Sequence, residues 1–241
     1  MSTSWGRRAQ RAGWGAALGA VFLVQLLAAQ ELPWRIIVHG NVTTSSQIFP
    51  SVDAADPVTR AQSYEVSSTV GYGGEVRYHF PSGNAAIGLS IDFLKATLDR
   101  PFVTSQIAPI PVTDGYTVVP VELTGYFIIP FSGKVFGVYM GAGGGVYFGQ
   151  RTLSIGNVSA PSYSNPPGGG IHVLGGVSYS PLPFLSVLGE MKFRDVQFKA
   201  TNKFAGATIE YEGRRIAVTQ LNDAHIYTDG VIFQIGVSLS L

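Results

Sequence analysis

The 241-residue sequence contains no cysteine and few charged residues, and both shortages exclude classes of protein. Without cysteine, the chain cannot form a disulfide scaffold, a thiolate metal site, a cysteine nucleophile or a lipid-modified N-terminal cysteine. Charged residues make up 13% of the chain against 46% hydrophobic residues, which excludes a disordered polyelectrolyte. The formal net charge of +1 gives no basis for nucleic-acid binding, so we expect no nucleic-acid partner.

Long apolar runs are also lacking, because the apolar stretch near the N-terminus covers only residues 16–27. Three arginines at positions 7, 8 and 11 precede it, and two alanines follow it, which is the pattern of a secretory signal peptide. A membrane-spanning helix needs roughly 20 apolar residues. We therefore expect a signal peptide at residues 1–29 and a single domain at residues 30–241. A signal anchor is the alternative.

Alternation of apolar and polar residues fills most of the remaining chain. From Tyr64 to Phe80, most even positions are apolar and the odd positions are polar residues or glycine. A period of two with one apolar face is typical of a β-strand. The pattern occurs in eight segments, at residues 34–39, 64–80, 87–93, 119–129, 136–148, 171–179, 185–194 and 231–241.

Short and long connections alternate between these segments. Tight turns are expected at residues 81–84, 131–134 and 181–183, and long connections at residues 45–63, 96–114, 152–168 and 195–227. This rhythm is typical of a transmembrane barrel with short periplasmic turns and long extracellular loops. We therefore predict an all-β fold, an eight-stranded antiparallel up-and-down transmembrane β-barrel with both termini in the periplasm.

The polarity of the two faces distinguishes a membrane barrel from a soluble one. A soluble barrel of the lipocalin kind hides its apolar face inside. Here the polar face carries ten charges that balance, which favours a polar lumen and an apolar face toward lipid, with a soluble exported barrel as the alternative. The charges are Arg35, Arg77, Arg151, Lys192 and Arg194 against Glu65, Glu75, Asp92, Glu122 and Glu190.

The chain resembles the small outer-membrane β-barrels of the outer-membrane-protein-A-like and W-like superfamily. The resemblance is clearest in residues 189–194 (GEMKFR) and 230–241 (GVIFQIGVSLSL). Such families end in an aromatic residue, whereas this chain ends in Leu241. The resemblance implies the outer membrane of a Gram-negative-type bacterium, a structural or interaction role at the cell envelope, and limited passage of small solutes or ions.

The same resemblance implies the partners of the chain. They are outer-membrane lipid and, during biogenesis, the barrel-assembly and periplasmic chaperone machinery. The long loops are candidates for binding an extracellular ligand, and the barrel is expected to be a monomer. Residues 208–218 in the longest loop predict a hairpin around a Glu-Gly-Arg tip. Arg214 and Arg215 are candidates for recognition there, with a merely solvated tip as the alternative.

Charged residues of the predicted lumen are the main functional candidates. We expect Glu122 opposite Gly143 and Tyr126 opposite Tyr139, with a row of inward glycines leaving space for Glu122. The network is either a static plug of ion pairs or a gate whose salt bridges exchange partners to open a narrow path. The charged candidates are Arg35, Glu75, Arg77, Asp92, Glu122, Glu190, Lys192 and Arg194, and the glycines are Gly141, Gly143 and Gly145.

Three histidines, His39, His79 and His172, fall on the polar face. A lipid-modifying hydrolase needs a histidine beside a serine and a carboxylate, and His172 is expected near Glu190 or Lys192. That face points into the lumen, however, and the Phe-x-His-x-Ser run of the lipid A deacylases is absent. We therefore expect no enzyme activity, no cofactor and no metal site, with a hydrolase as the less favoured alternative.

Overall fold

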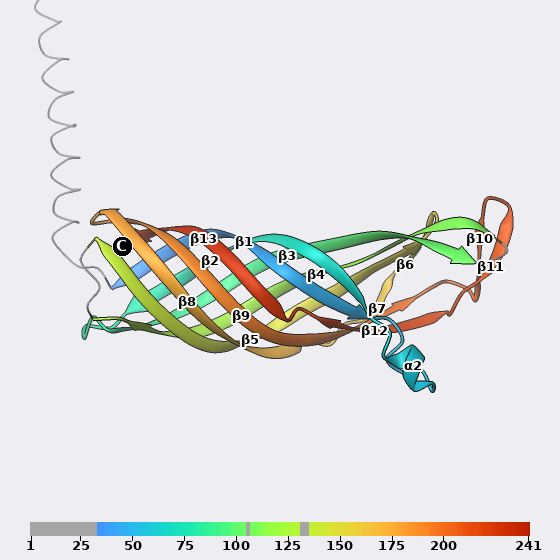
Figure 1. Cartoon of the computed structure of the whole chain (residues 1–241), viewed down its shortest axis with the longest axis horizontal. Coiled ribbons are helices and arrows are strands. Elements are labelled where there is room, and N and C mark those ends of the chain that lie inside the picture. Colours follow the sequence, from blue (N-terminus) through green and yellow to red (C-terminus); the bar gives the residue numbers. More distant parts are fainter. Residues whose placement is uncertain (1–32, 105–106, 131–134) are drawn as a thin grey trace, which may run out of the picture.

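The computed structural model describes residues 33–104, 107–130 and 135–241, so the expected signal peptide lies outside the described residues. Within these ranges, eight strands pair antiparallel in the order β1–β2–β3–β4–β5–β8–β9–β13, and β13 pairs with β1 to close the ring (Figure 1). The strands are β1 (Trp34–Phe49), β2 (Tyr64–His79), β3 (Ala85–Thr104), β4 (Ile107–Ile128), β5 (Phe136–Ile155), β8 (Gly168–Leu182), β9 (Leu185–Lys203) and β13 (Gly230–Ser240). The predicted eight-stranded barrel is confirmed.

The barrel has a short-turn end, where the C-terminus lies, and a loop end that carries the small elements (Figure 1). The short-turn end holds the β2–β3, β4–β5 and β8–β9 connections. In the described part of the chain, no helix is long and apolar enough to cross a membrane. The small elements are α2 (Pro57–Arg60), β6 (Val158–Ala160), β7 (Ser162–Ser164), β10 (Thr208–Tyr211), β11 (Arg214–Ala217) and β12 (Leu221–Tyr227).

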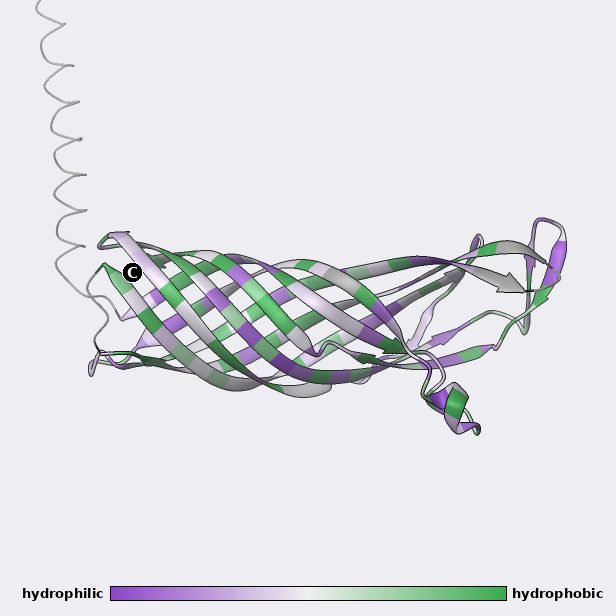
Figure 2. Cartoon of the chain, viewed as in Figure 1, coloured by the Kyte–Doolittle hydropathy of each residue, from purple (hydrophilic) through white to green (hydrophobic). Residues whose placement is uncertain are grey.

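Apolar side chains cover the outside of the barrel from the short-turn end to beyond its middle. Val70, Ile171 and Ile235 point outward, with exposed fractions of 68%, 68% and 73%. Because successive strand residues point to opposite faces, the polar residues between them point inward. Figure 2 shows the resulting alternation along the strands. This surface is the reverse of that of a soluble barrel and matches the apolar band of a membrane barrel.

Nearer the loop end, the polarity of the wall reverses. On β9, Phe193 is outward and apolar, but further along Phe198 is buried inside and Lys199 is outward. On β3, Leu94 is buried and Lys95 is exposed. The membrane-spanning part of the barrel therefore ends near this level, and the wall beyond it stands in water around an apolar core of its own.

The strands run further than the sequence pattern predicts. Residues 96–104 and 195–203 were expected in loops, but they continue β3 and β9. The prediction was wrong there because the faces exchange polarity, which interrupts the pattern without interrupting the pairing. The expected hairpin is confirmed: β10 and β11 pair across Glu212 and Gly213, whose φ angles of 50° and 73° fit a two-residue type I′ turn.

Near the loop end, β1 and β2 change which of their alternate side chains point into the lumen. Thr43 pairs with Ile232 and Gln47 with Tyr227, so four steps along β1 match five along the neighbouring chain, as in a β-bulge. Beyond this point Val66 faces inward, and Glu65 is exposed. The prediction that Glu65 lines the lumen was therefore wrong.

Candidate functional site

Inward positions on several strands bring the charged residues together inside the membrane-spanning part of the barrel. Glu75 and Arg77 come from β2, Asp92 from β3 and Glu122 from β4. Glu190, Lys192 and Arg194 follow one another at alternate positions of β9. All seven side chains are buried, with exposed fractions of 6% or less. Such burial requires that each charge has a partner nearby.

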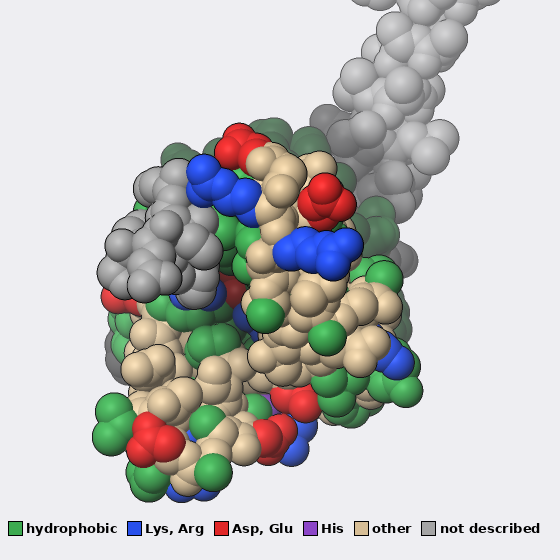
Figure 3. Space-filling model, turned by 90° about the vertical axis from the view of Figure 1, so that its right-hand side faces the viewer, with side chains coloured by type: hydrophobic (Ala, Val, Ile, Leu, Met, Phe, Trp, Pro, Cys, Tyr) green, Lys and Arg blue, Asp and Glu red, His purple; other side chains and the backbone are tan. Residues whose placement is uncertain are grey.

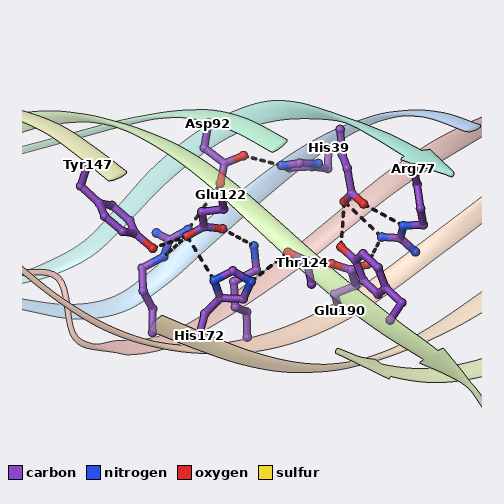
Figure 4. A network of polar contacts seen from close by, with 12 residues as sticks. His39, Arg77, Asp92, Glu122, Thr124, Tyr147, His172 and Glu190 are labelled. Carbon is purple, nitrogen blue, oxygen red and sulfur yellow. Dashed lines mark hydrogen bonds and ion pairs between the residues drawn. The ribbon is translucent and has the colours of Figure 1, made fainter. Parts of the chain in front are cut away.

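Glu122 is the centre of the main network, and it is fully buried (Figure 4). Its carboxylate accepts a hydrogen bond from the Tyr147 hydroxyl at 2.5 Å. Lys192 Nζ lies 2.8 Å from Oε2, and Arg194 Nε lies 2.9 Å from Oε1. Two cations and one phenol therefore surround a single carboxylate.

Asp92 extends this network across the lumen. Its Oδ1 lies 2.6 Å from His39 Nε2, and its Oδ2 lies 3.4 Å from Arg194 Nη2. Arg194 therefore bridges Asp92 and Glu122, which come from neighbouring strands. The four ionic groups, two acids and two bases, have no net charge.

His172 borders the network on the β8 side. Its Nε2 lies 2.9 Å from Thr124 Oγ1, and its Nδ1 lies 3.9 Å from Glu122 Oε1 (Figure 4). In the sheet register it pairs with Arg194 on β9 instead of the expected Glu190 or Lys192. Within the described residues, no group of three His, Cys, Asp or Glu side chains could hold a metal ion.

A second network lies nearer the short-turn end, around Arg77. The guanidinium donates to Glu75 at 2.8 Å and to Glu190 at 3.0 Å. It also stacks on the Tyr126 ring, with 3.7 Å between Cζ and the ring centroid. Tyr126 and Tyr139 in turn donate hydrogen bonds to Glu75 and Glu190, at 3.0 and 2.7 Å. Every charge of this network is thus held by both an ion pair and a phenol.

Inward glycines on β5 make room for the main network. A Cβ at Gly145 would lie 2.9 Å from Glu122 Cγ, and a Cβ at Gly143 would lie 2.9 Å from His172 Nε2. Gly141 would similarly meet Tyr126 Cδ1 at 3.1 Å. A larger residue at these three positions would collide with the side chains that form the network.

The strand register differs from the expected one by two residues. Glu122 pairs with Gly145 and Tyr126 with Gly141, instead of Gly143 and Tyr139. A shift of two keeps every side chain on its face, so the inward set is unchanged. The prediction was wrong because the sequence shows where the turn lies but not how many residues it contains, and the length of the turn sets the register. The turn residues 131–134 themselves lie outside the described residues.

Three other candidates lie at the two ends of the barrel. Arg35 sits half-buried on β1 at the short-turn end, opposite Arg77 and Ser240 in the register. Arg214 and Arg215 are exposed on β11 at the loop end. They therefore contact solvent and not the lumen.

A third ion-pair cluster, around Asp114, was not foreseen. This fully buried carboxylate accepts from Arg151 Nε at 2.8 Å and from the Tyr64 hydroxyl. The cluster lies beyond the apolar outer band, in the loop-end part. Burial, together with Asp114, raises the pKa of Tyr64 above its ordinary value. The alternation of β4 was the available signal, because Asp114 and Glu122 share one parity on that strand.

Apolar layers border the charged networks toward each end of the barrel. Toward the loop end, buried side chains from β1, β2, β3, β4, β5, β9 and β12 form one cluster. A smaller cluster, made by Ile37, Ala86, Tyr126, Tyr139, Leu174 and Leu188, lies at the short-turn end. The loop-end layer consists of Ile48, Val66, Leu94, Ala96, Tyr116, Val118, Tyr147, Val196, Phe198, Ala200, Ala224 and Ile226.

Comparison with known proteins gives matches among solved structures. No protein-family model and no curated protein sequence matches the chain. The outer membrane protein OprG from Pseudomonas aeruginosa is 15% identical, with a TM-score of 0.54 over 87% of this chain and 96% of OprG. Neisserial surface protein A is 10% identical, with a TM-score of 0.46 over 87% of this chain and 97% of that protein. The chain therefore has the fold of the small outer-membrane β-barrels.

Proposed function

We propose that this chain is a monomeric outer-membrane anchor, closed to ions and without catalytic activity, that holds its loop-end part outside the cell for contacts with other molecules. Both termini face the periplasm in this orientation. The observation that carries the proposal is the burial of the ion-paired charges of the lumen between two apolar layers.

The outer surface supports the membrane location. An aqueous protein rarely exposes large contiguous apolar patches, whereas a membrane barrel needs an apolar band about 25 Å tall. Residues such as Leu89, Phe148 and Ile235, on three separate strands, have exposed fractions of 51%, 54% and 73%. The likeness of the fold to OprG agrees with this location.

The interior supports closure to ions. An eight-stranded barrel is just wide enough for side chains to fill. An ion crossing this lumen would have to separate Glu122 from Lys192 and Arg194, and it would also have to cross both apolar layers. Separating the ion pairs would leave buried charges without partners, and crossing the apolar layers would take the ion out of water. Both steps are costly in a low-dielectric interior.

The loop end supports a role in recognition. Figure 3 looks onto this end and shows acidic and basic side chains on its surface. The β10–β11 hairpin stands on a small apolar cluster through Ile209, which is 6% exposed, while Arg214 and Arg215 are exposed. Exposed loops on a rigid scaffold are common sites of recognition.

Ion conductance of the refolded mature protein in a planar bilayer tests the proposal. Heat-modifiable migration on a gel first confirms that the barrel is folded, and an established pore in the same bilayer is the positive control. We expect no stepwise conductance. Stable steps from the folded protein would contradict closure.

A gated pore is the second candidate, because Arg194 contacts two carboxylates at once, Asp92 at 3.4 Å and Glu122 at 2.9 Å. Such a shared cation could change partners. Under this hypothesis, Arg194→Met changes a conductance that the unaltered barrel already shows. Under the anchor hypothesis, both proteins are silent.

A further inference from the structure

The cluster around Asp114 in the loop-end part holds more positive than negative charge. Arg151 donates two hydrogen bonds to this carboxylate, at 2.8 and 2.5 Å, and a second guanidinium, that of Arg100, lies 3.8 Å from it. Among the described residues, no other carboxylate is in ion-pair contact with either arginine. Because the pKa of Tyr64 is raised, its phenol stays neutral. Two cations therefore share one anion.

Arg100 is the member of this cluster that lacks a partner of its own. The oxygens of Asp114 already accept from Arg151 and from the Tyr64 hydroxyl. At 3.8 Å, Arg100 is beyond hydrogen-bond distance of Asp114, and it makes no hydrogen bond in the part of the chain that the structure describes. Its N–H donors therefore remain available.

The Tyr64 ring holds the guanidinium of Arg100 in place. The distance from Cζ to the ring centroid is 4.2 Å. Stacking covers the face of the planar guanidinium and leaves the N–H groups along its edge free to donate. The side chain of Arg100 is 42% exposed, so these groups can be reached from solution. The neighbouring Asp99 does not compete, since it lies on the other face of β3 and accepts from Thr113.

The exposure of Arg100 follows from the end of one strand pairing. β2 and β3 pair as far as Val70 and Lys95, whereas β3 continues to Thr104 (Figure 1). Beyond Lys95, no described strand pairs with the side of β3 that faces β2. Arg100 lies seven positions after the outward Phe93, or roughly 23 Å along the strand. Even at a tilt of about 45°, this distance takes it beyond the roughly 5–8 Å of lipid headgroups.

We propose that Arg100, oriented by Tyr64, binds the phosphate or carboxylate group of a ligand in solution outside the cell. Two oxygens of such a group match the paired N–H donors of a guanidinium, and the bound anion would offset the excess positive charge. Arg151 contributes charge but no contact, because its unpartnered Nη1 is buried. The location outside the cell rests on the proposed function, whereas binding itself depends on neither orientation nor conductance.

Nuclear magnetic resonance tests the site without any substitution. The folded barrel, labelled with ¹⁵N-arginine in a non-ionic detergent, is titrated with inorganic phosphate that replaces chloride at constant ionic strength. We expect the Nε–Hε peak of Arg100 to shift and saturate, and that of Arg77, which is buried and donates to Glu75, to stay in place. An unmoved Arg100 peak would overturn the proposal. So would a shift without saturation that the exposed Arg60 shares.

Two glutamine variants remove the same charge from the loop end. Arg100→Gln is expected to weaken phosphate binding in calorimetric titrations by about tenfold or more, because it removes charge-assisted hydrogen bonds. Arg60→Gln is the matched control and is expected to bind as the unaltered protein does. Both are checked for folding by heat-modifiable migration. Equal losses in the two variants would show general attraction to a positive surface and overturn the site.

Substitutions of Tyr64 test the orientation of Arg100. Tyr64→Phe keeps the ring and is expected to bind phosphate normally, whereas Tyr64→Leu is expected to weaken binding roughly two- to fivefold. Equal affinities in the two folded variants would refute the role of the ring.

Anionic lipid is the other source of a phosphate group. Phosphatidylglycerol added to the detergent micelles is expected to leave the Arg100 peak unchanged. A shift with this lipid would place Arg100 at the membrane surface and overturn the proposed ligand in solution.

Discussion

Substituting Glu122 by glutamine tests whether the central network stabilises the barrel. The change keeps the shape of the side chain but removes the anion that Lys192 Nζ and Arg194 Nε contact at 2.8 and 2.9 Å. Arg194 keeps Asp92, whereas in the described part of the chain Lys192 has no other carboxylate in ion-pair contact. Removing one partner of a buried ion pair costs about 3–5 kcal/mol, because the remaining charge is buried without compensation. We expect Glu122→Gln to lower the free energy of unfolding by that amount.

Urea unfolding in lipid vesicles measures this loss. Trp34 is the single tryptophan after residue 29, and its half-exposed side chain lies on the outer face, so its fluorescence reports on release from lipid. Glu65→Gln is the matched control, since this carboxylate is exposed and its substitution is expected to cost about 0.5 kcal/mol or less.

A double variant, Glu122→Gln with Lys192→Met, separates charge from shape. It removes both members of the pair, so we expect it to be more stable than Glu122→Gln alone. The reasoning is refuted if Glu122→Gln costs no more than Glu65→Gln, or if the double variant loses the sum of two independent effects.

Three other perturbations test the fit of the lumen and the independence of the loop end. Gly145→Val is expected to destabilise the barrel by about 1–3 kcal/mol in the same assay, because its Cβ would lie 2.5 Å from the Val121 carbonyl oxygen. Gly175→Val is the control, because Gly175 points outward and its added side chain meets open space. The pKa of Tyr64 is raised, so the folded chain keeps a proton that the unfolded chain loses near pH 10. The stability of the folded chain therefore falls as the pH rises above about 10. Tyr64→Phe is expected to reduce this fall between about pH 9 and 11. Replacing residues 208–217 by Asn-Gly, where Val218 already donates to the Ala207 carbonyl, is expected to leave heat-modifiable migration unchanged, and its loss would show that the hairpin supports the barrel.

The sequence was sufficient to predict the strands and their faces where the barrel meets lipid. Leu89 and Ile91 alternate with Ser90 and Asp92, and the structure places the first pair outside and the second inside. Such alternation is strong because the two faces meet unlike surroundings. Beyond Phe93 the inside becomes apolar and the outside polar, so the pattern changes phase although the strand continues. Strand ends therefore could not be predicted.

The contacts of the site could not be predicted from local pattern. Arg194 and Asp92 are 102 residues apart in the sequence, and they meet because four separate strand pairings bring β3 and β9 to the two sides of a narrow lumen. A register shift of one residue between β1 and the β12–β13 chain accompanies the reversal that turns Glu65 of β2 outward. Asp114, eight residues before Glu122 on the same face of β4, could have been found if that strand had been extended.

Inward glycines explain both how long side chains fit into the lumen and why the register of β4 on β5 was ambiguous. In so narrow a barrel, a long inward side chain needs a small residue on the next strand, as Asp92 needs Gly73 and Glu122 needs Gly145. On β5, however, three successive inward positions are glycine, so Glu122 could be accommodated opposite Gly143 or Gly145. The neighbouring β8 removes this freedom, because His172 occupies the space beside Gly143. The register of β4 on β5 thus depends on a third strand, and no pattern within the first two contains that information.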